Sequence, residues 1–292
     1  MKPISVIDTH QHLWDLDLIQ LPWLEFPGVA PLFRSFLMSD YVKATQNCQI
    51  NQSIYMEVNV HPDLQQQEAR YVLDLCSQAD NPMSGAVIGG QPGAAAFGRY
   101  LEEFVGNPFL KGVRTVLHDS DRPRRMCLTP QFKSNIKLLG ELGLSFDLCM
   151  RPDELKDAVE LVDGCPQTRF IVDHCGNMSV QSNEQSARSD WEEGMRLLAE
   201  RERVMCKISG IVATATPGDW QPMDLKETID FCLDTFGEDR VFFGGDWPVC
   251  TLTATYESWF NALVWVVRER SESFQRKLFH DNAHAFYALK NL

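Results

Sequence analysis

Residues 144–174 read LSFDLCMRPDELKDAVELVDGCPQTRFIVDH and contain one complete strand–helix–strand unit. The runs 144–149 and 170–174 are short, apolar and of strand length, and the segment 153–162 between them is helix-like. A terse connection, GCPQT at 164–168, leads into the second strand. Apolar strands separated by a helix are typical of a parallel sheet that is buried on both faces.

The same alternation recurs along the whole chain. Eight apolar runs of strand length lie at residues 4–8, 53–58, 85–90, 111–116, 144–149, 170–174, 204–209 and 241–246. Helix-like segments separate them, for example 63–79, 131–142 and 225–236. This pattern predicts an α/β protein, a single-domain (β/α)8 TIM barrel over residues 1–292. A doubly wound open sheet is the alternative, but no glycine-rich phosphate loop follows the first run.

The connections between these elements differ in length. Those that enter a strand are terse, whereas the connections 13–38, 117–130, 175–190 and 210–224, which leave strands, are long. In barrel enzymes the chemistry takes place at the carboxyl ends of the strands, on the loops that follow them. The sequence therefore predicts an active site at that end of the barrel.

Composition excludes several classes of partner. The formal net charge of −13 argues against nucleic acids and anionic membranes, both of which require a basic surface. No apolar run approaches the ~20 residues needed to cross a bilayer, and the first residues, MKPISVIDTH, lack a secretory apolar region. The nine cysteines include no C-x-x-C pair, which indicates reduced, mostly buried thiols. We expect a cytoplasmic protein.

Polar residues stand at the ends of the apolar runs. Asp8, His10 and His12 are spaced by two, which in a strand places them on one face. Other runs supply Glu57, Arg114, Asp147, Asp173, His174, Lys207 and Asp246. Polar groups at such positions are costly unless they are paired or used, and in a closed barrel they converge on one mouth. Histidines and carboxylates gathered there predict a hydrolase centre, with or without a metal.

Each candidate also has a structural interpretation. The H-x-H spacing of His10 and His12 is a weak signal alone, and it favours a site only because His174 and Asp246 are expected opposite. His174 alone is equally compatible with a satisfied buried histidine. Asp246 precedes a Trp-Pro dipeptide, so its position also fits a tight turn. Asp173 alternates with His174 and is expected to point outward.

Several further residues stay open between two roles. Arg114 suits either a substrate contact or an ion pair with Glu57 or Asp147, and Lys207 is ambiguous for the same reason. The polar segment 177–190 is either a lid or a surface loop. Structural or surface roles are expected for the histidines outside the strand ends: His61, His118, His280 and His284.

Seven blocks of sequence carry a resemblance to a known family. IDTHQHLWD, KGVR, LSFDLCMRP, FIVDHCGN, CKISG, FGGDWPV and NAHAFY occur in this order between residues 7 and 287. Together they resemble the amidohydrolase-2 family, and more narrowly its sugar-lactonase branch of L-fuconolactonase and L-rhamnonolactonase type, which is related to pyrone-dicarboxylate hydrolase. The resemblance implies a TIM barrel of hydrolases that are metal-dependent or, in some members, metal-independent.

The resemblance also implies roles for individual residues. His10 and His12 match the metal-binding pair of the first strand, and His174 matches the histidine of the DH-x-G block. Asp246 matches the aspartate that activates water, and it joins the histidines as a metal ligand. Arg114 matches the KGVR arginine, which is expected to hold a substrate oxygen or carboxylate. One divalent cation, with zinc as the expected ion, would occupy the centre, although a metal-free reaction is also compatible with these residues.

We therefore expect a lactonase that opens a small-molecule lactone, most plausibly a sugar lactone, to the hydroxy acid. Trp14 and Glu57 are expected to contribute to the substrate pocket. Glu57 departs from the glutamine that many relatives carry, and GGQPG at 89–93 replaces an expected aspartate, so both changes concern substrate identity. The alternatives are a metal-dependent decarboxylase of an unsaturated acid and a non-catalytic ligand-binding barrel. A homodimer is common among such barrels, but no segment of the sequence specifies an interface.

Overall fold

The computed structural model describes residues 5–182 and 184–290. Eight parallel strands pair in sequence order from the first to the last. They are β1 (Val6–Gln11), β2 (Ile50–Met56), β3 (Met83–Gly89), β4 (Leu110–Val116), β5 (Ser145–Cys149), β6 (Arg169–Val172), β7 (Val204–Ile208) and β8 (Val241–Phe243). The predicted (β/α)8 barrel is confirmed, and the doubly wound alternative is wrong.

Contacts between the last and first strands close the barrel. The backbone N–H of Asp246 donates to the carbonyl of His10 at 2.6 Å, and the N–H of His12 donates to the carbonyl of Trp247 at 2.7 Å. The hydroxyl of Thr9 adds a bond of 2.6 Å to the carbonyl of Phe243. Closure thus places three predicted site residues, His10, His12 and Asp246, side by side at the seam.

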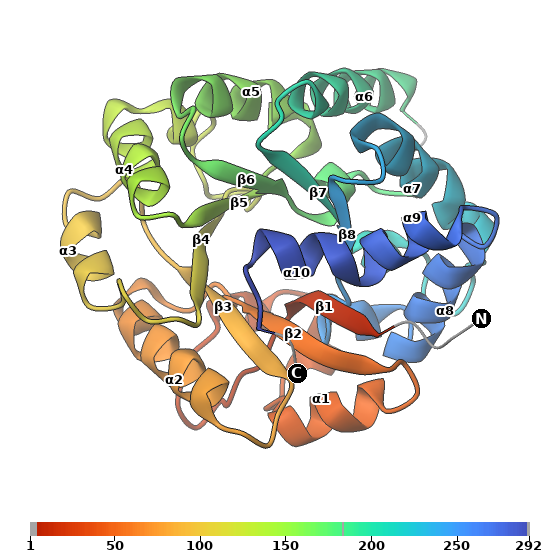
Figure 1. Cartoon of the computed structure of the whole chain (residues 1–292), viewed down its shortest axis with the longest axis horizontal. Helices are drawn as coiled ribbons and strands as arrows, with labels where there is room; N and C mark the ends of the chain where they lie inside the picture. The colour runs from red at the N-terminus through yellow and green to blue at the C-terminus, as the bar shows by residue number, and fades with distance from the viewer. Residues whose placement is uncertain (1–4, 183, 291–292) are drawn as a thin grey trace.

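Helices surround the barrel as an outer ring (Figure 1). They are α1 (Met38–Thr45), α2 (Gln65–Ser77), α3 (Phe97–Glu102), α4 (Pro130–Glu141), α5 (Leu155–Gly164), α6 (Gln185–Ala199), α7 (Pro222–Phe236) and α8 (Tyr256–Val266). Two shorter helices follow this ring in the chain, α9 (Glu272–Arg276) and α10 (Asn282–Phe286). The four helices expected over 63–79, 131–142, 153–162 and 225–236 correspond to α2, α4, α5 and α7. The connection expected over 177–190 is partly helical, because α6 begins at Gln185; residue 183 lies outside the described residues.

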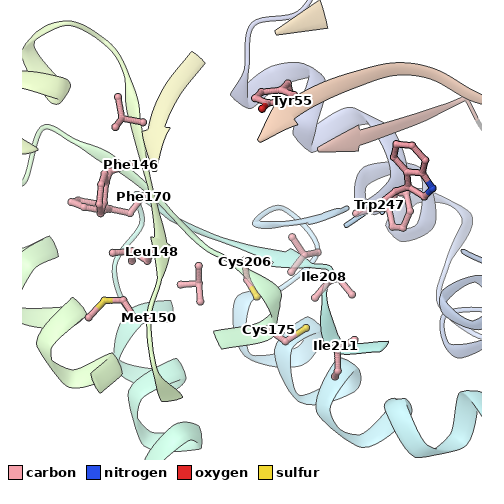
Figure 2. Packing of buried hydrophobic residues seen from close by; sticks show 14 of the residues in the cluster. Tyr55, Phe146, Leu148, Met150, Phe170, Cys175, Cys206, Ile208, Ile211 and Trp247 are labelled. Atoms are coloured by element: carbon pink, nitrogen blue, oxygen red, sulfur yellow. The ribbon is translucent and has the colours of Figure 1, made fainter. Parts of the chain in front are cut away.

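The main core lies between the strands and the outer helices. Figure 2 shows part of it, where Phe146 and Leu148 of β5, Phe170 of β6 and Ile208 of β7 lie buried. The rings of Phe146 and Phe170 contact edge to face, with centroids 6.5 Å apart. Burying a side chain of this size contributes about 1.5–3 kcal/mol to folding. The Val, Ile and Phe content of the runs therefore reflects strands covered on both faces.

A smaller apolar cluster closes one end of the barrel. It contains Ile7, Val87 and Phe242 together with Tyr287, which follows α10 and whose ring centroid lies 5.8 Å from that of Phe242. Figure 1 shows α10 crossing the centre of the barrel, so the C-terminal segment plugs this end. The opposite end, where the strands finish, is left to polar side chains and the long loops. Within the described residues, no helix combines the length and the apolarity needed to cross a membrane.

Candidate active site

A cavity opens at the carboxyl ends of the strands, where the unequal loop lengths predicted it. Its volume is about 350 Å³. The lining residues come from the ends of every strand except β3: His12, Trp14, Trp23, Phe26, Val29, Val58, Asn59, Arg114, Val116, His118, Asp119, Cys149, His174, Asn177, Gly210, Ala213, Thr214, Asp246 and Val249. A cavity of this size suits a small molecule.

The expectation that Asp8, His10 and His12 share one face is wrong for Asp8. The pairing of β1 with β2 shifts register between Asp8 and Gln11, so the simple alternation of side chains breaks within the strand. Asp8 accepts hydrogen bonds from the hydroxyls of Tyr41 of α1 at 2.8 Å and Tyr256 of α8 at 2.9 Å. It therefore binds the strand to the outer helices and lies away from the site.

His10, His12 and Asp246 form the centre of the cluster. His12 Nδ1 lies 2.9 Å from the carbonyl oxygen of Met56, so this nitrogen carries the proton and donates it. His12 Nε2 then presents a lone pair in the neutral ring, and it faces Asp246 Oδ1 at 3.2 Å. His10 Nε2 approaches the same oxygen at 3.6 Å. Two acceptors that face each other at hydrogen-bond distance require a proton or a metal cation between them.

The backbone after β6 positions His174 within the same cluster. His174 has a φ of 53°, in the left-handed region, and its Nδ1 lies 2.9 Å from Ser209 Oγ. Gly210 makes this close approach possible, because a Cβ there would lie 2.3 Å from His174 Nδ1. Bonding at Nδ1 leaves Nε2 available to the cavity. Burial lowers the pKa of His174, which favours the neutral ring.

The expectation that Asp173 points outward is also wrong. Asp173 follows the last residue of β6 and lies inside the barrel, 3.0 Å from Lys207 Nζ and 3.5 Å from His10 Nδ1. Lys207 also contacts Asp147 at 2.8 Å, so an ion-pair network lies directly beneath His10. Burial alone would raise the pKa of Asp173, but the charge of Lys207 outweighs it and holds that pKa well below its usual value.

Arg114 forms the ion pair with Glu57 that the sequence left open. Its Nε donates to Glu57 Oε1 at 2.6 Å, and its Nη2 donates to the Glu57 carbonyl at 2.7 Å. Its Nη1 lies 3.2 Å from His10 Nε2. The guanidinium is therefore held rigidly at the cavity floor with its charge largely balanced by Glu57. Trp14 lines the cavity as expected, and its ring nitrogen is fixed by the carbonyl of Arg34 at 2.6 Å.

A second carboxyl group lies close to this ion pair. Glu68 of α2 is buried, and its Oε1 accepts from the Tyr55 hydroxyl at 2.9 Å and from the Val58 N–H at 2.8 Å. Burial, with the charge of Glu57 next, raises the pKa of Glu68 from 4.5 to about 8. The folded protein therefore retains a proton that the unfolded chain loses near pH 4.5.

We expect this group to reduce stability as pH rises. Between pH 4.5 and about 8 only the folded state holds the proton, so the free energy of unfolding falls across that window. Glu68→Gln keeps the acceptor oxygen and removes the titration, so it should lose less stability than the wild type between pH 6 and 8.5. Urea unfolding at both pH values measures this. An unchanged pH dependence in the variant would show that Glu68 is already ionised at pH 6.

The donor set fits a divalent cation. His10, His174 and Asp246 each offer a ligand atom, and these atoms lie within 4.8 Å of one another. Imidazole nitrogens and carboxylate oxygens are the ligands that zinc takes in catalytic sites. Burial, with the charge of Lys207 next, lowers the pKa of His10, which keeps its ring neutral and able to bind a cation. His12 is outside this set but contacts the same Asp246 oxygen.

The balance of charge points the same way. The buried charged groups that ion pairs join to this cluster are four carboxylates and two basic side chains: Glu57, Asp147, Asp173 and Asp246, with Arg114 and Lys207. With all four carboxylates ionised, the described cluster carries two more negative than positive charges. Burial raises the pKa of Asp147 to about 7, so that excess is complete only above neutral pH. A divalent cation would neutralise it.

Sequence reasoning missed three contributors to this region. Asp173 was expected to point outward and Lys207 was left ambiguous, although both belong to the strand-end blocks FIVDHCGN and CKISG. His118 was assigned a structural or surface role, yet it lines the cavity beside Asp119. Its only signal in the sequence was its place in a long connection that leaves a strand.

Comparisons with known proteins agree with this architecture. The family model described as amidohydrolase matches residues 7–289, and the chain belongs to this family. An L-fucono-1,5-lactonase of Burkholderia multivorans is 27% identical over 295 residues, covering 97% of this chain and 96% of the relative. An uncharacterized protein of Sinorhizobium fredii is 27% identical over 311 residues, covering 98% of this chain and 99% of its own.

A solved structure is similar over the whole chain. An amidohydrolase from Burkholderia multivorans, crystallised with bound zinc, superposes with a TM-score of 0.86 at 25% identity. The match covers 98% of this chain and 99% of that protein. Family membership and these relatives support a hydrolase.

Proposed function

We propose that this protein opens a lactone ring by hydrolysis to give the hydroxy acid. The observation that carries the proposal is the position of Asp246, whose Oδ1 lies 3.2 Å from His12 Nε2 and 3.6 Å from His10 Nε2 at the floor of the cavity. A carboxylate that lies there beside two imidazoles is placed to take a proton from water. The similarity to an L-fucono-1,5-lactonase supports a cyclic ester as the substrate.

In the proposed reaction, Asp246 accepts a proton from the water that attacks the lactone carbonyl. A tetrahedral intermediate forms, and its collapse breaks the ring C–O bond. Asp246 then returns the proton to the alkoxide that leaves, so the products are a carboxylic acid and a hydroxyl group on one molecule. Proton transfer by one positioned group accounts for about 10²- to 10⁴-fold in rate.

Arg114 and His174 would stabilise the negative charge that develops on the carbonyl oxygen. Arg114 is fixed by Glu57 at 2.6 Å and still has N–H groups that these bonds do not use. His174 is fixed by Ser209 at 2.9 Å, with Nε2 available to the cavity. Rigidly held donors need no reorganisation during the reaction, and each contributes about 3–4 kcal/mol to such a transition state.

A zinc ion, if bound, would be held by His10, His174 and Asp246, with His12 on the same carboxylate. His174 Nε2 would then be a ligand, and Arg114 alone would donate to the carbonyl oxygen. It would polarise the carbonyl and lower the pKa of a water molecule. Lactones are more reactive than open esters, so Asp246 and His174 are also compatible with a reaction that uses no metal.

The first test measures acid release from a panel of lactones. Aldono-1,4-lactones, aldono-1,5-lactones and pyrone-dicarboxylates are offered to the purified protein in weak buffer with a pH indicator, with and without a chelator, while elemental analysis records zinc per chain. We expect acid release and about one zinc per chain. Removal of zinc should lower turnover by about two orders of magnitude or more, as loss of a several-kcal/mol electrostatic contribution implies.

Each other outcome changes the assignment. Acid release that survives complete removal of zinc would make His10 and His12 substrate-orienting groups and leave the chemistry to Asp246 and His174. Release of CO₂ from an unsaturated acid without ring opening would replace the lactonase by a decarboxylase. Ligand binding without turnover of any substrate would identify a binding barrel.

A further inference from the structure

The cavity has two chemically different sides. Strand order runs around the barrel, so the ends of β8, β1 and β2 lie opposite those of β4, β5 and β6. The first side is largely apolar above His12 and Asp246, with Trp23 and Phe26 on the loop after β1 and Val58 after β2. The second side carries Arg114, His118, Asp119, His174 and Asn177, with Val116 and Cys149 as its less polar members. A substrate that fills this space must therefore also have an apolar and a polar side.

The apolar side is fixed by local contacts. The ring nitrogen of Trp23 donates to the carbonyl of Val58 at 2.8 Å, and the Trp23 ring packs edge to face against Trp14, with centroids 5.6 Å apart. Phe26 lies at the rim with 64% of its surface exposed. An exposed aromatic ring beside a cavity is the residue most able to gain contacts when a ligand covers it.

On the polar side, a buried thiol fixes the orientation of His118. His118 Nδ1 lies 3.2 Å from the Cys149 sulfur, and Cys149 is 1% exposed. Burial raises the pKa of the Cys149 thiol, so it keeps its hydrogen and donates it to the ring nitrogen. Burial also lowers the pKa of His118, which favours the neutral ring. With the thiol donating to Nδ1, the neutral ring carries its own hydrogen on Nε2.

Asp119 completes a donor and acceptor pair with His118. Its Oδ2 accepts from the side-chain amide of Asn59 at 2.9 Å, while its Oδ1 lies 3.7 Å from His118 Nε2. That separation is too long for a direct hydrogen bond. A hydroxyl oxygen that lies to one side of the pair, within hydrogen-bond distance of both atoms, would accept from His118 and donate to Asp119.

Charge excludes an acidic group as the occupant of this side. Among the described residues that line the cavity, Arg114 is the only lysine or arginine, and Glu57 holds it at 2.6 Å. Asp119 adds a negative charge beside it, and its side chain is 30% exposed. A substrate carboxylate here would meet Asp119 with little compensating positive charge.

We propose that His118 Nε2 and Asp119 Oδ1 together bind a hydroxyl group of a neutral hydroxylated lactone, whose apolar edge packs against Trp23 and Phe26. This inference rests on the proposed hydrolysis of a lactone and narrows its substrate class. Asp119 and His118 are specificity-determining residues in this scheme, and neither takes part in the chemistry at the carbonyl.

The test compares kcat/KM for three kinds of substrate: an aldonolactone, the unsubstituted lactone of the same ring size, and a lactone that carries a carboxylate. Wild-type protein should prefer the aldonolactone. In Asp119→Ala, the ratio of kcat/KM between the aldonolactone and the unsubstituted lactone should fall about ten- to a hundred-fold, because a hydrogen bond to a charged acceptor is lost. Asp119→Asn keeps an acceptor oxygen and should recover part of the ratio.

Asp121→Ala is the matched control, because this side chain is 81% exposed in the same loop and lies outside the residues that line the cavity. It should leave the ratio unchanged, and thermal melting checks the fold of all three variants. An Asp119→Ala protein that loses activity equally on every lactone, or a wild type that prefers the acidic lactone, would overturn the hydroxyl site while the lactonase stands. A wild type that opens no lactone at all overturns the proposed function itself.

Discussion

Asp246→Asn is expected to lower kcat for lactone opening by about 10²- to 10⁴-fold, the range that a general base supplies. An asparagine side chain has nearly the same shape but cannot accept a proton at neutral pH. Asp246 Oδ1 lies 3.2 Å from His12 Nε2, which bears the lone pair in the neutral ring, so the variant amide can still bond to this nitrogen through its N–H groups. The fold should therefore survive while turnover is lost.

The measurement is kcat on the best lactone of the panel, with melting temperature and zinc content recorded for the same protein. Asp63→Asn is the matched control, because its side chain is 89% exposed and is not among the residues that line the cavity. Retained turnover in Asp246→Asn would falsify the assignment of the base. Lost turnover together with lost zinc would show that Asp246 acts chiefly as a ligand. The zinc content therefore separates loss of a metal ligand from loss of the base.

The barrel itself was predictable because its cause is repeated eight times in the sequence. Each strand is a short apolar run covered on both faces, so the pattern of β5, α5 and β6 in residues 144–174 recurs along the chain. Boundaries were less predictable. The run 241–246 was expected to be one strand, but β8 ends at Phe243, and Asp246 has a φ of 53°. Its turn was anticipated from the Trp-Pro dipeptide that follows.

The convergence of the candidate residues was predictable, but the direction of each side chain was not. His10, His12, His174 and Asp246 converge because strand order in the barrel forces it. Asp8 and Asp173 were placed on the wrong side, since strict alternation applies only within a regular strand. The register shift of β1 breaks it next to Asp8, and Asp173 lies beyond the end of β6. A sequence pattern does not reveal such a shift, so the charged layer under His10 could not be predicted from it.

That charged layer leads to the largest expected effect on stability. Lys207 is fully buried, with its Nζ 2.8 Å from Asp147 and 3.0 Å from Asp173. Burial alone would lower the pKa of Lys207, but the two carboxylates outweigh it and raise that pKa above its usual value. The ammonium group is therefore the cation that makes two buried carboxylates tolerable inside the barrel.

Lys207→Met is expected to lower the free energy of unfolding by about 3–5 kcal/mol, because removal of one partner leaves an uncompensated buried charge. Methionine has a similar length and fills most of the same space, so packing changes little. The double variant Lys207→Met/Asp147→Asn removes one charge of each sign and should recover part of the loss. Lys137→Met, at an exposed position of α4, should change stability by no more than about 0.5 kcal/mol.

Urea unfolding of the four proteins at pH 7.5 separates charge from packing. If the loss arises from unpaired carboxylates, the double variant is more stable than the single one. It lacks the charge of Asp147, and Asp173 keeps its contacts with Arg114 at 3.4 Å and His10 at 3.5 Å. If the single and double variants are equally unstable, the loss arises from the missing side chain of Lys207 itself or from the changed surroundings of His10. A single variant as stable as the wild type would mean that Asp147, whose pKa is raised to about 7, takes up a proton when Lys207 is absent. The stability of Lys207→Met would then fall as the pH rises through the raised pKa of Asp147, a dependence that Lys137→Met should lack.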